Sequence, residues 1–291
     1  MTGAFPRALS PSRANDFQQC PLLFRLRSID RIPDAPAPAA LRGNLVHTTL
    51  ERLFDLPAHE RDVEAARGLF ATAWTELADT DAIGAAAVMA DAGLGDDAAQ
   101  AAAVADAMVA RIAPLLDTYF TLEDPTRLEP HAREVAVSVE ITEGFSIRGF
   151  IDRVDRAPAG QIRIVDYKSG KAPRAGFESK AMFQMRFYAL AWWRLTGEIP
   201  AMLQLLYLGS KEALRYEPAE QDLLNTEQKI LSIRARIQQA VAQGFTPSPS
   251  RLCGWCSYQH LCPQYGGTPP ELPHESTWES VAFESARNEP A

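Results

Sequence analysis

The sequence has few lysines, few cysteines and no long hydrophobic run. Only five of its 29 basic residues are lysines, and only four of its 291 residues are cysteines. No run of about 18 apolar residues is present, so we expect no transmembrane helix. The first residues, MTGAFPRALS, lack the apolar segment of a secretory signal, and we expect a cytoplasmic protein. The Gly-x4-Gly-Lys-Ser/Thr loop of nucleotide-driven motors is also absent, which argues against a helicase.

Positive charge is scarce as well. The formal net charge is −8 and the pI is about 5.2, which argues against a protein coated in basic charge for nucleic acid. A local basic cleft is not excluded, because arginines gather near the N-terminus, at Arg7, Arg13, Arg25, Arg27, Arg31 and Arg42. With 46% hydrophobic and 23% charged residues, the composition is that of a globular protein with one elaborated domain or two.

Helical and alternating patterns follow each other along the chain and predict an α/β fold. In chain order, we expect a short helix within 10–28 capped by Ser10 or Ser12, a linker at 32–40, a helix at 43–56, a helical region at 58–120 broken at Gly84 and 92–95, strands at 133–142, 145–156 and 161–168, a helix at 178–196, a strand at 201–209 and a helix at 219–243. The three consecutive strands should pair in antiparallel fashion, because short turns separate them.

The third predicted strand, QIRIVDYK, ends with an acid and a lysine on one face. Residues i and i+2 of a strand share a face, so Asp166 and Lys168 are neighbours and Tyr167 points away. Two other acid-x-Lys triplets occur, but neither follows a strand and precedes a Gly-containing turn. Taken alone, the triplet could also be an exposed ion pair of little energetic value. In a chain with so few lysines, one at this position favours a functional role.

Further residues could join this pair around a metal ion. Asp152 lies on the preceding predicted strand, and adjacent strands are about 5 Å apart, so its carboxylate and that of Asp166 can share a hard cation. His47 lies on a predicted helix with Glu51 one turn later, and a neutral imidazole binds Mn²⁺ and similar ions beside carboxylates. Each also has a plainer interpretation: Asp152 as a solvent-facing acid, His47 and Glu51 as surface or structural residues.

Four short motifs occur in order along the chain. They are Gly-x-x-x-His from Gly43 to His47, Gly-x-x-Asp from Gly149 to Asp152, Asp-Tyr-Lys-Ser-Gly from Asp166 to Gly170, and Gln-x-x-x-Tyr from Gln184 to Tyr188. Gln184 and Tyr188 stand one turn apart near the start of a helix, a spacing that is also typical of a core edge. The ordered set resembles the RecB-type branch of the PD-(D/E)XK nuclease superfamily, over roughly residues 10–265.

The resemblance implies a restriction-endonuclease-like α/β core in a single nuclease domain over residues 1–267, with a helical insertion at about 58–120. It implies that His47, Asp152, Asp166 and the backbone carbonyl of Tyr167 bind Mg²⁺ or Mn²⁺, that Asp152, Asp166 and Lys168 are catalytic, and that Gln184 and Tyr188 line the DNA path. Lys168 would orient or activate the attacking water. A metal ion suits this reaction, because phosphodiester hydrolysis needs an activated water and neutralised phosphate charge.

The four cysteines form one C-terminal trio and one distant residue. Cys253, Cys256 and Cys262 follow a Cys-x2-Cys-x5-Cys spacing, and Cys20 precedes them by more than 230 residues. Disulfides are not expected in a cytoplasmic protein. Four thiolates suit Zn²⁺ or an iron–sulfur cluster, although structural zinc sites usually use two close pairs. Unrelated buried thiols are the plainer alternative.

The cysteine spacing is similar to that of iron–sulfur nucleases of the AddB type and of the CRISPR-associated RecB-like type. The resemblance implies a structural [4Fe–4S] cluster that joins the N-terminal helix to the C-terminal segment. Cys20 would then anchor the segment 21–27 and carry Arg25 and Arg27 towards DNA. Three ring-bearing residues among the cysteines would shield the cluster or stack on bases: Trp255, Tyr258 and His260.

Together these patterns predict a metal-dependent deoxyribonuclease. The resemblance implies exonuclease action on single-stranded or frayed DNA ends in repair or recombination, without base readout, because a groove that follows the backbone contacts phosphates. The protein would act alone or with a separate helicase or recombination subunit. The alternatives are a CRISPR-adaptation nuclease, a catalytically silent DNA-binding subunit of a helicase–nuclease complex, or a zinc-ribbon module on an inactive core. We expect the acidic tail at 268–291 to be disordered.

Overall fold

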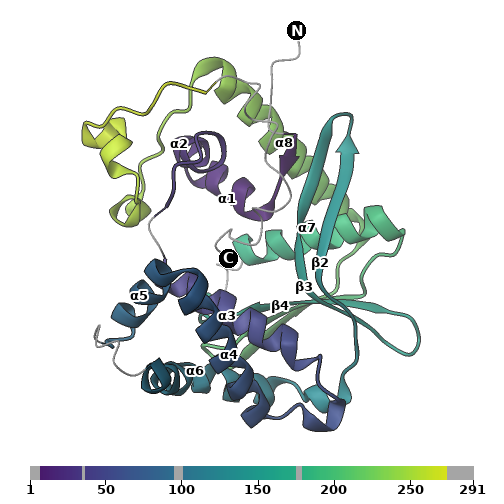
Figure 1. Ribbon diagram of the computed structural model, residues 1–291. Coiled ribbons are helices and arrows are strands. Elements are labelled where there is room, and N and C mark those ends of the chain that lie inside the picture. The colour runs from purple at the N-terminus through teal and green to yellow at the C-terminus, as the bar shows by residue number, and fades with distance from the viewer. Residues whose placement is uncertain (1–6, 35–36, 95–100, 175–178, 274–291) are drawn as a thin grey trace.

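The computed structural model describes residues 7–34, 37–94, 101–174 and 179–273 (Figure 1). A six-stranded mixed sheet lies between two groups of helices. None of the helices in the described ranges is long and apolar enough to cross a membrane. The predicted α/β fold is confirmed. The predicted disorder of the tail concerns mainly residues 274–291, which lie outside the described residues.

The long strand β3 organises the sheet. The strands are β1 (Ala8–Leu9), β2 (Pro130–Thr142), β3 (Phe145–Arg156), β4 (Ile162–Lys168), β5 (Met202–Tyr207) and β6 (Glu212–Tyr216). β2 runs antiparallel to β3 along most of its length, β4 runs antiparallel to the end of β3, and β1 pairs with its beginning. β2, β3 and β4 are therefore the predicted antiparallel series. β5 then lies parallel to β4, and β6 antiparallel to β5.

The sequence pattern does not predict β6, a short edge strand. Its residues, EALRY, are half-exposed or exposed and show no apolar stripe. The chain reverses after β5 through a turn in which Lys211 has a left-handed backbone, with φ at 63°. β6 then pairs with β5 from Leu203 to Tyr207. Backbone pairing with a buried neighbour, rather than its own side chains, makes this segment a strand.

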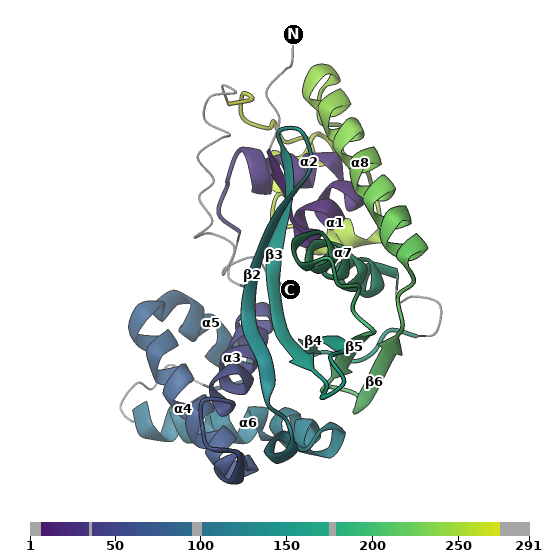
Figure 2. The ribbon, with the colours of Figure 1, turned by 90° about the vertical axis from the view of Figure 1, so that its right-hand side faces the viewer.

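The helices form two groups on opposite sides of the strands (Figure 2). One group contains α1 (Pro11–Gln19), α2 (Pro21–Phe24), α7 (Ser179–Thr196) and α8 (Glu220–Gln243), and the other contains α3 (Pro38–Leu53), α4 (Val63–Thr80), α5 (Ala82–Asp91) and α6 (Ala101–Leu122). A π-helical turn, Arg25–Ile29, extends α2. In the second group, α4, α5 and α6 cover the region at 58–120 that the sequence predicts to be helical.

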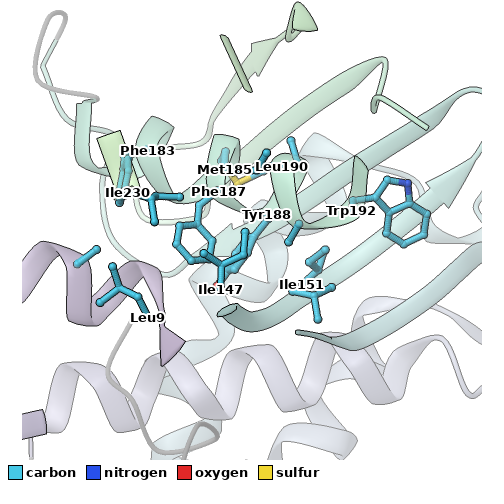
Figure 3. Packing of buried hydrophobic residues seen from close by; sticks show 14 of the residues in the cluster. Leu9, Ile147, Ile151, Phe183, Met185, Phe187, Tyr188, Leu190, Trp192 and Ile230 are labelled. Atoms are coloured by element: carbon cyan, nitrogen blue, oxygen red, sulfur yellow. The ribbon is translucent and has the colours of Figure 1, made fainter. Parts of the chain in front are cut away.

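Each helix group has its own hydrophobic core against the sheet. The α7 core joins β3 and β4 to α7 and α8, with Ile147 and Ile151 packed among α7 side chains such as Phe187 (Figure 3). The α3 core joins α3, α4 and α6 to β4 through Val165 and Tyr167. Successive residues of β4 are therefore buried on opposite faces, which fixes the register of this strand because a one-residue slip would exchange the two faces.

One predicted helix cap is confirmed and two predicted helix boundaries are wrong. Ser10 caps α1, because its hydroxyl accepts a hydrogen bond from the Arg13 backbone N–H at 3.3 Å. α3 begins at Pro38 rather than at residue 43, since proline fits the first turn of a helix. The break expected at Gly84 falls at Asp81 instead, whose side chain accepts from the Gly84 N–H and caps α5.

A buried arginine fastens the end of α3 to the segment that leads into β2. Arg61 is only 4% exposed, and its guanidinium donates to the carbonyls of Leu56 and Leu128 at 2.9 and 2.7 Å. It also donates to the carbonyls of Phe54 and Pro125 at 3.4 and 3.3 Å. These carbonyls lie outside the α-helices and strands, so Arg61 supplies the hydrogen bonds that their position requires.

Replacing Arg61 by methionine should lower the free energy of unfolding by about 3 kcal/mol, because several inward-facing carbonyls lose their donor. Urea unfolding of Arg61→Met measures this loss. The control is Arg67→Met, since Arg67 is more exposed and pairs with Glu64 and Asp117 on the surface. That change should cost less than about 1 kcal/mol. Equal, small losses in both variants would contradict the role given to Arg61.

Candidate functional site

Three neighbouring strands each place one carboxylate in a row across the sheet. In the register of β2 and β3, Glu134 falls opposite Asp152. In the register of β3 and β4, Arg153 pairs with Val165, which brings Asp152 next to Asp166. The structure therefore brings together the two carboxylates that the sequence motifs select, and adds a third from β2.

His47 reaches this row from α3. Its Nδ1 lies 3.3 Å from Asp152 Oδ2, and its Nε2 lies 2.8 Å from the backbone oxygen of Tyr167. The Tyr167 N–H donates to the same Asp152 oxygen at 2.8 Å. His47, Glu134 and Asp152 each offer one ligand atom, and these atoms lie within 4.8 Å of one another. This spacing allows the three residues to hold one metal ion.

Glu134 is a candidate ligand that the sequence patterns miss. It lies in an alternating strand between Arg133 and Val135, where its charge suggests a solvent-facing position. Its φ of 44° is uncommon for a residue with a side chain and is typical of places where the surroundings impose the backbone conformation. Register could have revealed it, because pairing the two predicted strands around Gly144 places Glu134 within one residue of Asp152.

Lys168 and Gln184 form a second cluster around Asp166. Lys168 Nζ lies 3.0 Å from Asp166 Oδ2 and donates to Gln184 Oε1 at 2.9 Å. The Gln184 amide donates to Asp166 Oδ1 and to the Tyr188 hydroxyl, both at 3.2 Å. The Asp-Tyr-Lys and Gln-x-x-x-Tyr motifs, predicted to converge, therefore contact each other. Among the described residues, Asp166 lies outside the tight group that contains His47.

Gly149 allows Tyr188 to reach this cluster. A Cβ atom at Gly149 would lie 2.7 Å from Tyr188 Cε1, closer than carbon atoms approach in proteins. The glycine of the Gly-x-x-Asp motif is thus required by close packing of α7 on β3. Gly43, in the other glycine motif, would bring a Cβ to 3.4 Å from Ser169 Oγ, which is an ordinary contact. Steric crowding therefore does not explain why position 43 is a glycine.

Burial and neighbouring charges set the protonation of His47 and Asp152. Burial alone would lower the pKa of His47, but the carboxylates of Asp152 and Asp166 raise this pKa to about 9. Burial would raise the pKa of Asp152, yet the His47 charge and hydrogen bonds from His47 and the Tyr167 N–H hold it below its ordinary value. His47 is therefore a cation at neutral pH, with both ring nitrogens close to oxygen atoms.

Asp166 is buried, and the partly buried Lys168 beside it carries the opposite charge. Burial raises the pKa of Asp166 to about 6, with the Lys168 charge opposing the rise and the Asp152 charge adding to it. Burial would lower the pKa of Lys168, but the charges of Asp166 and Asp152 raise it above its ordinary value. Lys168 therefore stays charged at neutral pH, and acts as a cation and hydrogen-bond donor rather than as a base.

The residues of this site suit a hard divalent cation. Carboxylates with one imidazole are ligands that Mg²⁺ and Mn²⁺ accept. Asp166 Oδ2 is buried and, among the described residues, faces the Lys168 charge without a well-directed hydrogen bond. The Tyr167 carbonyl lies 2.8 Å from His47 Nε2, so this nitrogen must be free of its proton before it can bind an ion. The Glu51 side chain is not in the group of close ligand atoms found in the described residues.

All four cysteines line one pocket beside α2. Cys20, between α1 and α2, shares it with Cys253, Cys256 and Cys262 of the C-terminal segment. Backbone N–H groups donate to the sulfurs of Cys20 and Cys253 at 3.4 and 3.3 Å. Zn²⁺ bound at about 2.3 Å would hold four sulfurs about 4 Å apart. In the described ranges no three cysteine sulfurs lie within 4.8 Å of one another, so their spacing is wider than that of a zinc site.

The ring-bearing side chains near the cysteines divide into buried and exposed ones. Tyr258 is 2% exposed, and its hydroxyl donates to the Ile32 carbonyl at 2.9 Å. Trp255 is 81% exposed, and His260 is exposed as well. Tyr258 can therefore shield the pocket, as the sequence suggests. The expectation of shielding is wrong for Trp255 and His260, whose side chains face the surface.

Arg25 and Arg27 both pair with carboxylates of this chain. Arg25 Nε lies 3.0 Å from Asp30, and Arg27 contacts Asp16 at 2.9 Å and Asp34 at 2.5 Å. These ion pairs connect α1, the π-helical turn and the segment that follows it. Because of these ion pairs, the charges of both arginines are balanced within the chain. That the two arginines contact DNA stays a prediction.

One protein family matches most of this chain. The family model described as the PD-(D/E)XK nuclease superfamily matches residues 8–263. Gene 69 protein of Mycobacterium phage L5 is 32% identical over 142 residues, which are 46% of this chain and 45% of that protein, so the match spans less than half of either. Two crystal structures are similar at lower levels. SSO0001 has 15% identity, a TM-score of 0.36 and coverage of 77% of this chain and 85% of its own. A Eubacterium rectale protein, described as a candidate exonuclease, has 14% identity, a TM-score of 0.48 and coverage of 95% and 94%.

The raised pKa of His47 predicts that metal affinity depends on pH. Only the neutral imidazole can bind a cation, so a metal must displace a proton whose pKa is about 9. The affinity for Mn²⁺ should therefore rise by up to about tenfold per pH unit from pH 7 towards pH 9 and then level off. Calorimetric titration with Mn²⁺ at several pH values measures this slope and the proton released.

Two histidine variants serve as controls for this slope. His47→Gln should bind Mn²⁺ more weakly and lose the rise between pH 7 and 9, because no imidazole proton competes. His59→Gln should behave like the unaltered chain, since His59 is exposed and pairs with Glu60 at the surface. An affinity that does not change between pH 7 and 9 in the unaltered chain would contradict the prediction.

Proposed function

Because this chain belongs to the PD-(D/E)XK nuclease superfamily, we propose that it is a metal-dependent exonuclease that hydrolyses phosphodiester bonds in DNA. The observation that carries the proposal is the convergence of α3, β3, β4 and α7 on one centre. There the Lys168 ammonium lies 3.0 Å from the Asp166 carboxylate, and His47 lies 3.3 Å from Asp152. These residues supply a cation site and a fixed positive charge beside it.

His47, Asp152 and Asp166 would hold Mg²⁺ or Mn²⁺, with Glu134 and the Tyr167 carbonyl as further oxygen donors. The bound ion would lower the pKa of water and neutralise phosphate charge. Residues of the chain hold the ligands in place and keep them ionised. Asp152 is held in place by the Tyr167 N–H at 2.8 Å, and both carboxylates stay ionised because cations surround them.

Lys168 would orient the attacking water and stabilise the charge that develops on the phosphate. Its charged state supports this role, since a buried ammonium close to the reacting phosphate is a strong electrostatic donor. Gln184 fixes its position through the 2.9 Å hydrogen bond. Gln184 would line the path of the DNA near the scissile bond, and Tyr188, which is only 7% exposed, would support it from behind through the hydrogen bond to its hydroxyl. Contacts of this type read the backbone, so cleavage would not depend on sequence.

We further propose single-stranded or frayed DNA ends as the substrate and repair or recombination as the setting, with or without a helicase partner. This part rests on the motif resemblance. A CRISPR-adaptation nuclease would use the same centre. A catalytically silent DNA-binding subunit is less well supported, because it would not need Lys168 and two carboxylates buried together at a cost in desolvation.

A [4Fe–4S] cluster is proposed for the cysteine pocket. Its support is that all four cysteines line the pocket and that backbone N–H groups donate to two of the sulfurs. Burial raises the pKa of the Cys256 thiol, with the nearby Cys20 and Cys253 adding to the rise. The cluster would join α1 and α2 to the C-terminal segment.

The nuclease proposal is tested with 5′-labelled and 3′-labelled single-stranded DNA and Mn²⁺. The unaltered chain, purified without oxygen, should shorten the DNA, and the two labels give the polarity. Asp166→Asn and Lys168→Ala should each lower the rate at least about 100-fold, since each removes a charge at the reacting phosphate. Lys180→Ala is the matched lysine control and should keep full activity, because Lys180 contacts Gln19 away from the centre.

Two results would overturn the nuclease proposal. Full activity of Asp166→Asn and Lys168→Ala would place the reaction elsewhere or in a contaminant. A folded, unaltered chain that binds DNA but never shortens it with Mg²⁺ or Mn²⁺ would favour the silent DNA-binding subunit.

Replacing Cys256 by serine should remove most of the bound iron and lower the thermal midpoint, because cluster binding is coupled to folding. Iron content and visible absorbance of the anaerobically purified protein measure this. Ser257→Ala, at the next position, should keep both. Zinc in place of iron, or unchanged iron in Cys256→Ser, would contradict the cluster.

A further inference from the structure

A second network of charges lies behind the proposed metal site, on the opposite face of the sheet. Arg153 follows Asp152 on β3, so alternation turns its side chain away from the metal site. It is 1% exposed. Its guanidinium contacts Glu123 at 2.7 Å and Asp155 at 3.0 Å, and donates to the Tyr167 hydroxyl at 2.7 Å. Arg153 therefore joins the end of α6, β3 and β4.

The ionic part of this network is balanced without the tyrosine. Arg153 and Arg163 supply two positive charges, and Glu123 and Asp155 supply two negative charges. Arg163 lies 2.7 Å from Asp155 and 3.3 Å from Glu123, so each carboxylate is shared by both arginines. The Tyr167 hydroxyl adds a hydrogen bond but no charge. Charge balance alone therefore does not require the contact between Arg153 and Tyr167.

Tyr167 is the link between this network and the metal site. Its ring is buried between His47 and Tyr119, with ring centroids 5.9 Å from each and edge-to-face geometry. Its backbone oxygen contacts His47 Nε2, and its N–H donates to Asp152 at 2.8 Å. The Tyr167 backbone thus contacts two proposed metal ligands, His47 and Asp152, while Arg153 holds the Tyr167 hydroxyl. A displacement of Tyr167, side chain and backbone together, would change both backbone contacts.

We propose that Arg153 is a positioning residue for the metal site: by holding the Tyr167 hydroxyl, it fixes the backbone groups that orient His47 and Asp152. The inference rests on the proposed function, because it concerns the same site. It goes further by assigning a role to a buried residue that touches neither metal nor DNA. Removing a group that orients a metal ligand typically lowers metal affinity or activity 10-fold to 100-fold.

The test is Tyr167→Phe, which removes the hydroxyl and leaves the ring and all four charges. Arg153→Met is less informative, because it leaves Glu123 and Asp155 short of a cation and threatens folding. Tyr167→Phe should weaken Mn²⁺ binding about 10-fold in calorimetric titration, which needs no DNA. In cleavage assays, kcat should fall while KM for DNA stays the same. Arg153→Lys, which keeps the charge but loses the planar fork, should give a loss of the same kind.

The matched control is Arg156→Met on the same strand. Arg156 is at the surface and pairs with Glu198, so Mn²⁺ affinity and kcat should be unchanged. Tyr167→Phe with the Mn²⁺ affinity and kcat of the unaltered chain would overturn the proposal. A lower thermal midpoint with unchanged Mn²⁺ affinity would overturn it too, since it would show a structural role only. An unaltered chain that binds Mn²⁺ without cleaving DNA would count against the nuclease proposal alone, because the Mn²⁺ comparison would still decide the role of Arg153.

Discussion

Side chains alternate between the two faces of β3 and β4, and the antiparallel register of these strands aligns the alternation. On one face, Asp152 comes next to Asp166. On the other, Arg153 comes within 2.7 Å of the Tyr167 hydroxyl. The candidate metal site and the charge network behind it are thus two consequences of one strand pairing. A slip of one residue would move carboxylates into the α3 core and aromatic rings into the site, so hydrophobic burial on both faces of β4 also protects the site.

Burial makes the charges of this centre depend on one another. An isolated carboxylate or ammonium is costly in such surroundings, and each persists because an opposite charge lies within about 4 Å. Asp152 faces His47, Asp166 faces Lys168, and Arg153 faces Glu123. The raised pKa of His47 has the same origin: the carboxylates favour a positive charge at this place. A divalent cation would satisfy the same preference, which is why an acidic row beside a histidine suits metal binding.

The sequence alone predicts those features of the fold and the site that depend on residues close together in the chain. Helix periodicity, strand alternation and the i, i+2 rule gave the α/β fold, the β2–β3–β4 series and the shared face of Asp166 and Lys168. It could not give what depends on register or on a distant partner. Glu134 needed the pairing of β2 with β3, and β6 needed a buried neighbour. The local pattern does not distinguish Arg153 from a solvated charge on a strand, because nothing in it shows that Glu123, after another helix, balances the guanidinium.

The centre also depends on both helix groups at once. His47 comes from α3 and Glu123 from the end of α6, on one side of the sheet, while Gln184 comes from α7 on the other. β4 lies between them and contributes Asp166, Tyr167 and Lys168 in three consecutive positions. Neither helix group alone can therefore complete the site. A protein built in this way gains a buried, rigid centre only when both cores have packed on β4, so preorganisation of the ligands and stability of the fold share one origin.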